Sequence, residues 1–293
     1  MKITGFTIAR NVIQYDYPIV ESLMSLLPLC DEVVVAVGKS TDETLELIKS
    51  IPSSKIRIVE TVWDESLRAG GKVLAIETDK AFQAISEDTT WCIYLQADEV
   101  LHEHDYEEIR QQLSKYESDK SVDGFILKYR HFYGSYDYIG DARLWYRNEI
   151  RILRKNPDFY SYRDAQGFRK SDGTKLKVLK INAFVYHYGW VKHPKYQQMK
   201  QKNFNKLWHD DNWVSENIAD VDEFDYSQID SLQRFEGTHP KVMEKRIESI
   251  NWKFSFDPTQ RKLSLKNKIL MTIERWTGWR IGEYKNYQLL KNR

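Results

Sequence analysis

The chain has 293 residues, of which 41% are hydrophobic, enough for one large domain or a domain with an extension. Its 44 Lys and Arg residues balance 43 Asp and Glu residues, so no global positive field attracts nucleic acid, and we expect no nucleic-acid partner. No signal sequence and no membrane-spanning run is apparent, which predicts a cytoplasmic protein. Cys30 and Cys92 lie in apolar runs and are expected to be buried free thiols.

Short apolar runs alternate with segments of helical period from residue 3 to residue 96. This pattern is typical of a parallel sheet with crossover helices. We expect strands at residues 3–9, 33–37, 56–59 and 91–95. We expect one helix from Pro18, one after a capping box of Ser40 and Glu43, and one over residues 74–85. The sequence therefore predicts an α/β fold with a mainly parallel sheet flanked by helices.

The rhythm changes after residue 96. Asp105 and Glu108 can cap a short helix, further strands are expected at residues 124–129, 147–154 and 183–186, and residues 133–146 resemble an ordered loop over a binding face. Beyond residue 190 we expect helices at 195–209, 240–250 and 263–276. These form a helical C-terminal extension that packs on the first domain.

An acidic turn follows the predicted strand at residues 91–95. The sequence there continues Gln96, Ala97, Asp98, Glu99. Ligands of open α/β sheets bind at the carboxyl ends of the strands. A divalent cation needs only one or two protein carboxylates when diphosphate oxygens and water complete its shell. The alternative is an acidic turn that caps the next element.

Two segments together resemble glycosyltransferase family 2, whose members have the GT-A fold. Gln96-Ala97-Asp98 occupies the place of the family's Asp-x-Asp motif, although Gln96 replaces the first acid. Ser40, Thr41, Asp42 and Thr44 match the family's turn after strand two, although its preceding acidic pair is absent. The resemblance implies a catalytic domain over residues 1–190, with a nucleotide-sugar half at about 1–100 and an acceptor half at about 101–190, followed by the extension at 191–293.

The resemblance also implies where the sugar-nucleotide donor binds. The donor-binding residues it places at strand ends are Ala9, Arg10, Asn11, Gly38, Asp42, Gln96 and Asp98. Independently, Gly70-Gly71-Lys72 precedes a predicted helix, where backbone N–H groups and the Lys72 ammonium can meet a diphosphate. The alternatives are a solvated strand end, a charge that stabilises the first helical turn, and a flexible glycine turn.

The resemblance assigns a second metal ligand and a base. His187, in an aromatic turn that contains a glycine, resembles the histidine that closes the metal site, and with Asp98 it favours Mn²⁺ slightly over Mg²⁺. Asp164 occupies the place of the catalytic Asp and is expected to accept the acceptor proton. Asp141 and Glu149 are rival bases, and Asp164 can instead pair with Arg163 or Arg169.

These expectations define an inverting, metal-dependent glycosyltransferase. The donor is a UDP-sugar, with a GDP-sugar as the alternative, and the acceptor is a glycan or lipid-linked glycan in surface polysaccharide or glycan assembly. A sugar-nucleotide pyrophosphorylase is disfavoured because its Gly-rich, Arg-bearing loop is absent from the N-terminus. A catalytically inactive sugar-nucleotide-binding or scaffolding protein is the alternative from another class.

The last predicted helix is basic and amphipathic. Its charged and apolar residues interleave as Lys262, Leu263, Leu265, Lys266, Lys268, Ile269, Leu270, Arg275 and Trp276. Peripheral docking at the inner face of an anionic membrane, contact with a second subunit, and packing on the catalytic domain are the three interpretations of this pattern.

Overall fold

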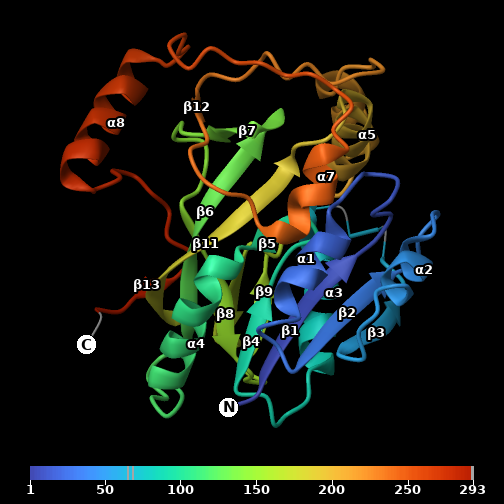
Figure 1. Cartoon of the computed structure of the whole chain (residues 1–293), viewed down its shortest axis with the longest axis vertical. Helices are drawn as coiled ribbons and strands as arrows, with labels where there is room; N and C mark the ends of the chain where they lie inside the picture. Colours follow the sequence, from blue (N-terminus) through green and yellow to red (C-terminus); the bar gives the residue numbers. More distant parts are fainter. Residues whose placement is uncertain (65, 68, 292–293) are drawn as a thin grey trace.

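The computed structural model describes residues 1–64, 66–67 and 69–291. One large mixed sheet runs through the molecule, with helices on both sides (Figure 1). Its first part is parallel, in the order β3-β2-β1-β4. These strands are β1 (Ile3–Ala9), β2 (Glu32–Gly38), β3 (Ile56–Thr61) and β4 (Trp91–Tyr94). The predicted α/β class with a parallel core is confirmed.

Three helices connect the parallel strands. They are α1 (Ile19–Leu26), α2 (Thr44–Lys49) and α3 (Lys72–Ala84), the last preceded by a 3₁₀ turn at Ala69–Gly71. Alternate side chains of β2 enter different cores, with Val33 and Val35 on the side of α1 and Val34 and Ala36 on the side of α3. A strand buried on both faces needs a continuous apolar run, as predicted. Cys30 and Cys92 are buried and free, which is also confirmed.

The second part of the sheet is mainly antiparallel. From β4 the order continues β8-β6-β7-β12, and β11 pairs with β6, β5 and β13. The strands are β5 (Glu99–Leu101), β6 (Gly124–Tyr133), β7 (Ser135–Gly140), β8 (Asn148–Arg154), β11 (Lys177–Trp190), β12 (Leu232–Arg234) and β13 (Gln288–Leu289). A separate hairpin joins β9 (Phe159–Tyr162) to β10 (Gly167–Lys170). Between β5 and β6 lie a 3₁₀ turn at Glu103–Asp105 and α4 (Tyr106–Lys115).

Most of the regular elements beyond residue 190 are helices, joined by long irregular segments. The helices are α5 (Pro194–Asn205), α6 (Asp211–Asn217), α7 (Glu244–Glu248), preceded by a 3₁₀ turn at Lys241–Met243, and α8 (Leu265–Thr277). β12 and β13 return from this part to the main sheet, so the extension is not purely helical. In Figure 1, α8 lies at one side of the molecule, well apart from α5 and α7. Among the described residues, no helix combines the length and apolar character needed to cross a bilayer.

Three local predictions were wrong. Ser40 and Glu43 form no capping box, because the Ser40 hydroxyl donates to the Gly38 carbonyl and accepts the Asn11 N–H, and α2 begins only at Thr44. Residues 133–146 contain β7, which pairs with β6 and β12. The predicted aromatic turn at His187 lies inside β11, which continues to Trp190 and pairs His187 with Glu99 and His131. In each case tertiary pairing overrides the local sequence signal.

Candidate active site

Two loops meet at the carboxyl edge of the parallel sheet and are tied together by Asp42. Its carboxylate accepts backbone N–H groups from Ile13 at 3.0 Å, Gln14 at 2.8 Å and Thr44 at 3.1 Å. Asn11, with a left-handed φ of 52°, accepts the Thr41 N–H at 2.8 Å. The matched residues of the Ser-Thr-Asp turn therefore shape the loop after β1, and the oxygens of Asp42 are already engaged.

Beside these loops, Trp63 covers Gly38. A Cβ atom on Gly38 would lie 2.3 Å from Trp63 Nε1, so the glycine is required for this close approach. The Arg10 guanidinium lies 5.3 Å from the centre of the Trp63 ring, and its Nε donates to the Lys39 carbonyl at 3.2 Å. The buried Trp63 Nε1 has no hydrogen-bond partner among the described residues. Arg10, Gly38 and Trp63 thus form a stacked, partly polar wall.

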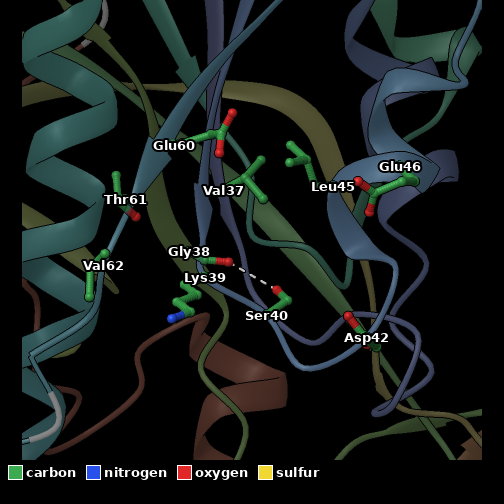
Figure 2. Close-up of a pocket in the computed structure, with 10 residues that line it drawn as sticks. All are labelled: Val37, Gly38, Lys39, Ser40, Asp42, Leu45, Glu46, Glu60, Thr61 and Val62. Atoms are coloured by element: carbon green, nitrogen blue, oxygen red, sulfur yellow. Dashed lines mark hydrogen bonds between the residues drawn. The ribbon is translucent and has the colours of Figure 1, made fainter.

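A cavity of about 500 Å³ opens beside this wall, at the ends of β2 and β3 (Figure 2). Its lining residues are Val37, Gly38, Lys39, Ser40, Asp42, Leu45, Glu46, Glu60, Thr61 and Val62. β2 and β4 flank β1, and neighbouring strands are spaced by ~4.8 Å, so the ends of β2 and β4 lie roughly 10 Å apart. This spacing suits a ligand with a planar group at β2 and an anionic group at β4.

Asp98 follows β4 and is 7% exposed. Its Oδ2 atom lies 3.7 Å from His187 Nε2 and 3.3 Å from the Lys200 ammonium. Its backbone carbonyl accepts the Tyr188 N–H at 2.8 Å, which fixes the acidic turn against β11. The structure therefore brings the two predicted metal ligands together and adds a lysine that the sequence did not indicate.

A chain of hydrogen bonds sets the tautomer of His187. His131 Nε2 lies 2.8 Å from the Tyr146 carbonyl, which only accepts, so His131 carries its proton on Nε2. Burial lowers the pKa of both histidines, which favours neutral rings. His131 Nδ1 then accepts the proton of His187 Nδ1 at 3.1 Å. His187 Nε2 is left with a lone pair that faces the Asp98 carboxylate.

The space between His187 and Asp98 is kept open by Gly189. A Cβ atom there would lie 2.5 Å from Asp98 Oδ2 and 2.7 Å from His187 Nε2. A carboxylate oxygen and an imidazole lone pair, with a second histidine fixing the tautomer, are a chemically suitable donor set for Mn²⁺ or Mg²⁺. The residues present fit a divalent cation that takes its remaining ligands from water and diphosphate.

Two lysines lie beside this pair. Lys200, whose side chain is 11% exposed, also donates to the Gly189 carbonyl at 3.0 Å, and the fully buried Lys192 donates to the Tyr15 carbonyl at 2.8 Å. The amino groups of Lys200 and Lys192 lie over the Tyr17 ring, at 5.0 Å and 4.3 Å. Burial lowers the pKa of Lys192 well below its ordinary value, which disfavours its charged form. Burial acts to raise the pKa of Asp98, but the nearby Lys200 ammonium, the largest of the opposing charges, helps to lower it to about 2.

Glu99, next to Asp98 in sequence, has a different role. Both of its oxygens accept from the buried Arg151 guanidinium at 2.8 Å, and one also accepts from the Tyr129 hydroxyl at 2.6 Å. Glu99 and Arg151 are fully buried. This complete ion pair leaves Glu99 no capacity for a metal and locks β5 to β8.

Asp164 lies at the turn of the β9-β10 hairpin. Its neighbours Arg163 and Ala165 have left-handed φ values of 57° and 63°, a strained arrangement that clusters at functional sites. A Cβ atom on Gly71, directly before α3, would lie 3.0 Å from Asp164 Cβ and from Trp208. Burial raises the pKa of Asp164. Asp164 is therefore a half-buried carboxylate beside the start of α3, where Lys72 is exposed.

The rival bases differ in availability. Asp141 accepts from the Ser231 hydroxyl at 2.6 Å and pairs with Arg261 at 2.9 Å. Glu149 is buried, one of its oxygens has no partner among the described residues, and burial raises its pKa to about 8, with Asp164 adding to the shift. Glu149 thus keeps its proton at pH 7, and the nearby Asp164 carboxylate favours this protonated form.

The remaining predicted donor residues, Ala9 and Gln96, lie at the same edge of the sheet. Ala9 ends β1 and is buried, and Gln96 donates its N–H to Glu99 at 3.0 Å and accepts from the Ser22 hydroxyl at 3.2 Å. Sequence reasoning missed Lys192, Lys200 and His131. Each stands alone in its segment, and only the pairing of His131 with His187 across β6 and β11 and the placement of α5 join them to the site.

No family model and no curated protein matches this chain. Among solved structures it is similar to S. aureus TarS 1–349, with a TM-score of 0.38 and 13% identity over 69% of this chain and 64% of that chain. The same protein in complex with UDP gives a TM-score of 0.40 and 13% identity over 75% and 67%. Glucosyl-3-phosphoglycerate synthase from Mycobacterium tuberculosis, in complex with Mn²⁺, UDP and glucosyl-3-phosphoglycerate, gives 0.30 and 17% over 45% of each chain. The chain thus spans less than two thirds of the first of these structures, and its function has to be argued from its own residues.

Proposed function

We propose that this chain is a nucleotide-sugar glycosyltransferase of the GT-A type that transfers a sugar to an acceptor hydroxyl with inversion. The observation that carries the proposal is the placement of Asp98 Oδ2 and His187 Nε2 3.7 Å apart, with Gly189 bordering both atoms. A carboxylate and an imidazole lone pair at the carboxyl edge of a parallel sheet suit a cation that binds a diphosphate.

In this proposal the base of the donor lies in the cavity at the ends of β2 and β3, and its diphosphate lies at Asp98 and His187. The wall of Arg10, Gly38 and Trp63 suits a planar base, and the loop held by Asn11 and Asp42 leads from the cavity toward Asp98. Lys200 adds positive charge where the diphosphate would lie, and Lys72 at the start of α3 is a further candidate. We propose a UDP-sugar donor first and a GDP-sugar second.

Asp164 is the proposed base. The acceptor oxygen forms a bond to the anomeric carbon, the bond from that carbon to the diphosphate breaks, and the diphosphate leaves with the electron pair. The acceptor proton passes to Asp164, whose raised pKa suits proton transfer near neutral pH. A divalent cation held by Asp98 and His187 would stabilise the negative charge on the departing diphosphate. The acceptor is proposed to be a glycan or lipid-linked glycan, in surface polysaccharide or glycan assembly.

Gly189→Ala and Asp98→Ala test the proposal most directly. The added methyl group enters the space between the two ligands, and the Asp98 substitution removes one of them. We expect both variants to lose Mn²⁺-dependent binding of UDP in calorimetry and to lose transfer from UDP-sugars. A thermal-shift panel of nucleoside diphosphates and nucleotide sugars, with and without Mn²⁺, identifies the base, because a ligand of the native state raises its melting temperature.

Asp141→Ala is the matched control, because its carboxylate is paired with Arg261 away from the cation pocket. It should keep the Mn²⁺ requirement. Full activity of Gly189→Ala with an unchanged Mn²⁺ requirement would place the metal elsewhere. Tight nucleotide binding without turnover of any sugar nucleotide would favour the binding or scaffolding alternative.

A further inference from the structure

α8 presents an apolar face to solvent. None of its residues is buried, and the exposed fractions of its large apolar side chains are 75% for Leu265, 53% for Ile269 and 84% for Trp276. Positions separated by three, four, seven and eleven residues share one face of a helix, so these three side chains form a single stripe. Trp279, 64% exposed, follows directly after the helix. A stripe of this kind normally packs against a core, whereas here it faces solvent.

The opposite face of α8 is attached to the body of the protein. Glu274 pairs with Arg143 at 2.9 Å and with Arg147 at 3.0 Å. Arg280, just beyond the helix, donates to the carbonyls of Arg143 and Trp145 at 2.6 Å and 2.9 Å. These contacts hold the face with Glu274 and the half-buried Leu270 and Met271 toward the body, and the stripe of Leu265, Ile269 and Trp276 outward. Figure 1 shows α8 at the edge of the molecule, clear of the other helices.

The charges on the exposed part of α8 have one sign. Lys266 lies to one side of the stripe and Lys268 and Arg275 to the other, and all three are exposed. Among the described residues they form no ion pair, while the one acidic residue of the helix, Glu274, is turned inward and paired. An apolar stripe with tryptophans and flanking cations complements a layer that has an apolar interior beneath an anionic outer surface.

We propose that α8 is an interfacial helix that docks this protein on an anionic phospholipid bilayer, with Leu265, Ile269, Trp276 and Trp279 at the level of the headgroups and Lys266, Lys268 and Arg275 on lipid phosphates. The chemistry of the helix carries this inference, which does not depend on the reaction at the Asp98 pocket. The helix Leu265–Thr277 lies on the membrane and does not span it.

The full chain is tested by co-sedimentation with vesicles of phosphatidylcholine alone and with vesicles that also contain phosphatidylglycerol. We expect binding to the anionic vesicles only, weakened by added salt because exposed charges are screened. The double variants Ile269→Glu/Trp276→Glu and Lys266→Glu/Lys268→Glu should each lower the affinity at least tenfold. Quenching of tryptophan fluorescence by brominated lipids should fall when Trp276 and Trp279 are replaced by Leu, because these two indoles are expected to enter the bilayer.

Val221→Glu is the matched control, since it adds the same charge at an apolar side chain that is 47% exposed but lies outside α8. It should bind vesicles as the unmodified chain does. Equal binding to neutral and anionic vesicles, or no binding to either, would overturn the proposal. A dimer in light scattering that Ile269→Glu/Trp276→Glu converts to a monomer would also overturn it, and would assign the stripe to a second copy of the chain.

Discussion

Asp98 and Glu99 are neighbours in the chain and both are buried, yet they belong to two different regions. Glu99 belongs to a closed region, where Arg151 and the Tyr129 hydroxyl use its lone pairs. Asp98 belongs to a cluster of polar side chains, where one oxygen lies 3.7 Å from His187 Nε2 and 3.3 Å from the ammonium of Lys200. A buried carboxylate whose partners all come from the protein stabilises the fold. A buried carboxylate whose oxygen faces the lone pair of a histidine can share a cation with it.

The two regions also differ in how their charge is balanced. Beside Asp98, the Lys200 ammonium balances the carboxylate, and burial disfavours a charge on Lys192. Beyond Glu99, burial raises the pKa of Glu149 to about 8, and the nearby Asp164 carboxylate adds to that shift. The carboxyl group of the first region is therefore ionised at neutral pH, whereas Glu149 in the second keeps its proton.

Asp164→Asn should give the largest effect on the reaction. The amide keeps the size of the side chain but accepts no proton, so transfer should fall about 10²–10⁴-fold while donor and Mn²⁺ binding persist. A transfer assay beside calorimetry of donor binding measures both quantities. Asp141→Asn, in the paired rival, should leave the rate nearly unchanged. Near-normal transfer by Asp164→Asn would move the role of base to Glu149.

Arg151→Met should give the largest effect on stability. The variant leaves Glu99 buried without its partner, which typically costs about 3–5 kcal/mol. Lys202→Met is the control, because Lys202, 37% exposed at its side chain, pairs only at the surface with the exposed Asp220, where screened ion pairs contribute little to stability. Urea unfolding of the two variants compares them. Equal losses would contradict the distinction between the closed region and the surface.

Glu149→Gln should change how stability depends on pH. Burial raises the pKa of Glu149 from 4.5 to about 8, so the folded protein keeps a proton that the unfolded chain releases. Stability is then lost as the pH rises from about 4.5 to about 8, by up to a few kcal/mol at about 1.4 kcal/mol for each pKa unit. The variant should match the unmodified chain near pH 4.5 and be more stable at pH 8. Thermal melts at both pH values test this, and parallel curves would place a charged Glu149 in the native protein.

Much of the parallel half of the fold could be predicted from local pattern. β1 begins and ends where the apolar run does. The continuous run of valines predicted correctly that β2 is buried on both faces. The hairpin around Asp164 and the strand β7 could not be predicted, because their residues pair with partners distant in sequence or with each other through a turn of non-glycine residues in left-handed conformations.

The candidate site divides in the same way. The sequence by itself determined that Asp98 closely follows a buried strand and that a glycine lies near His187 in the chain, because strand periodicity and residue type are local properties. Only the tertiary structure decided that these two side chains face each other across Gly189, that Glu99 is neutralised by Arg151, and that Lys192 and Lys200 enter the pocket. Those facts depend on the register of β11 with β5 and β6 and on the docking of α5. Both are fixed by packing between segments far apart in the chain.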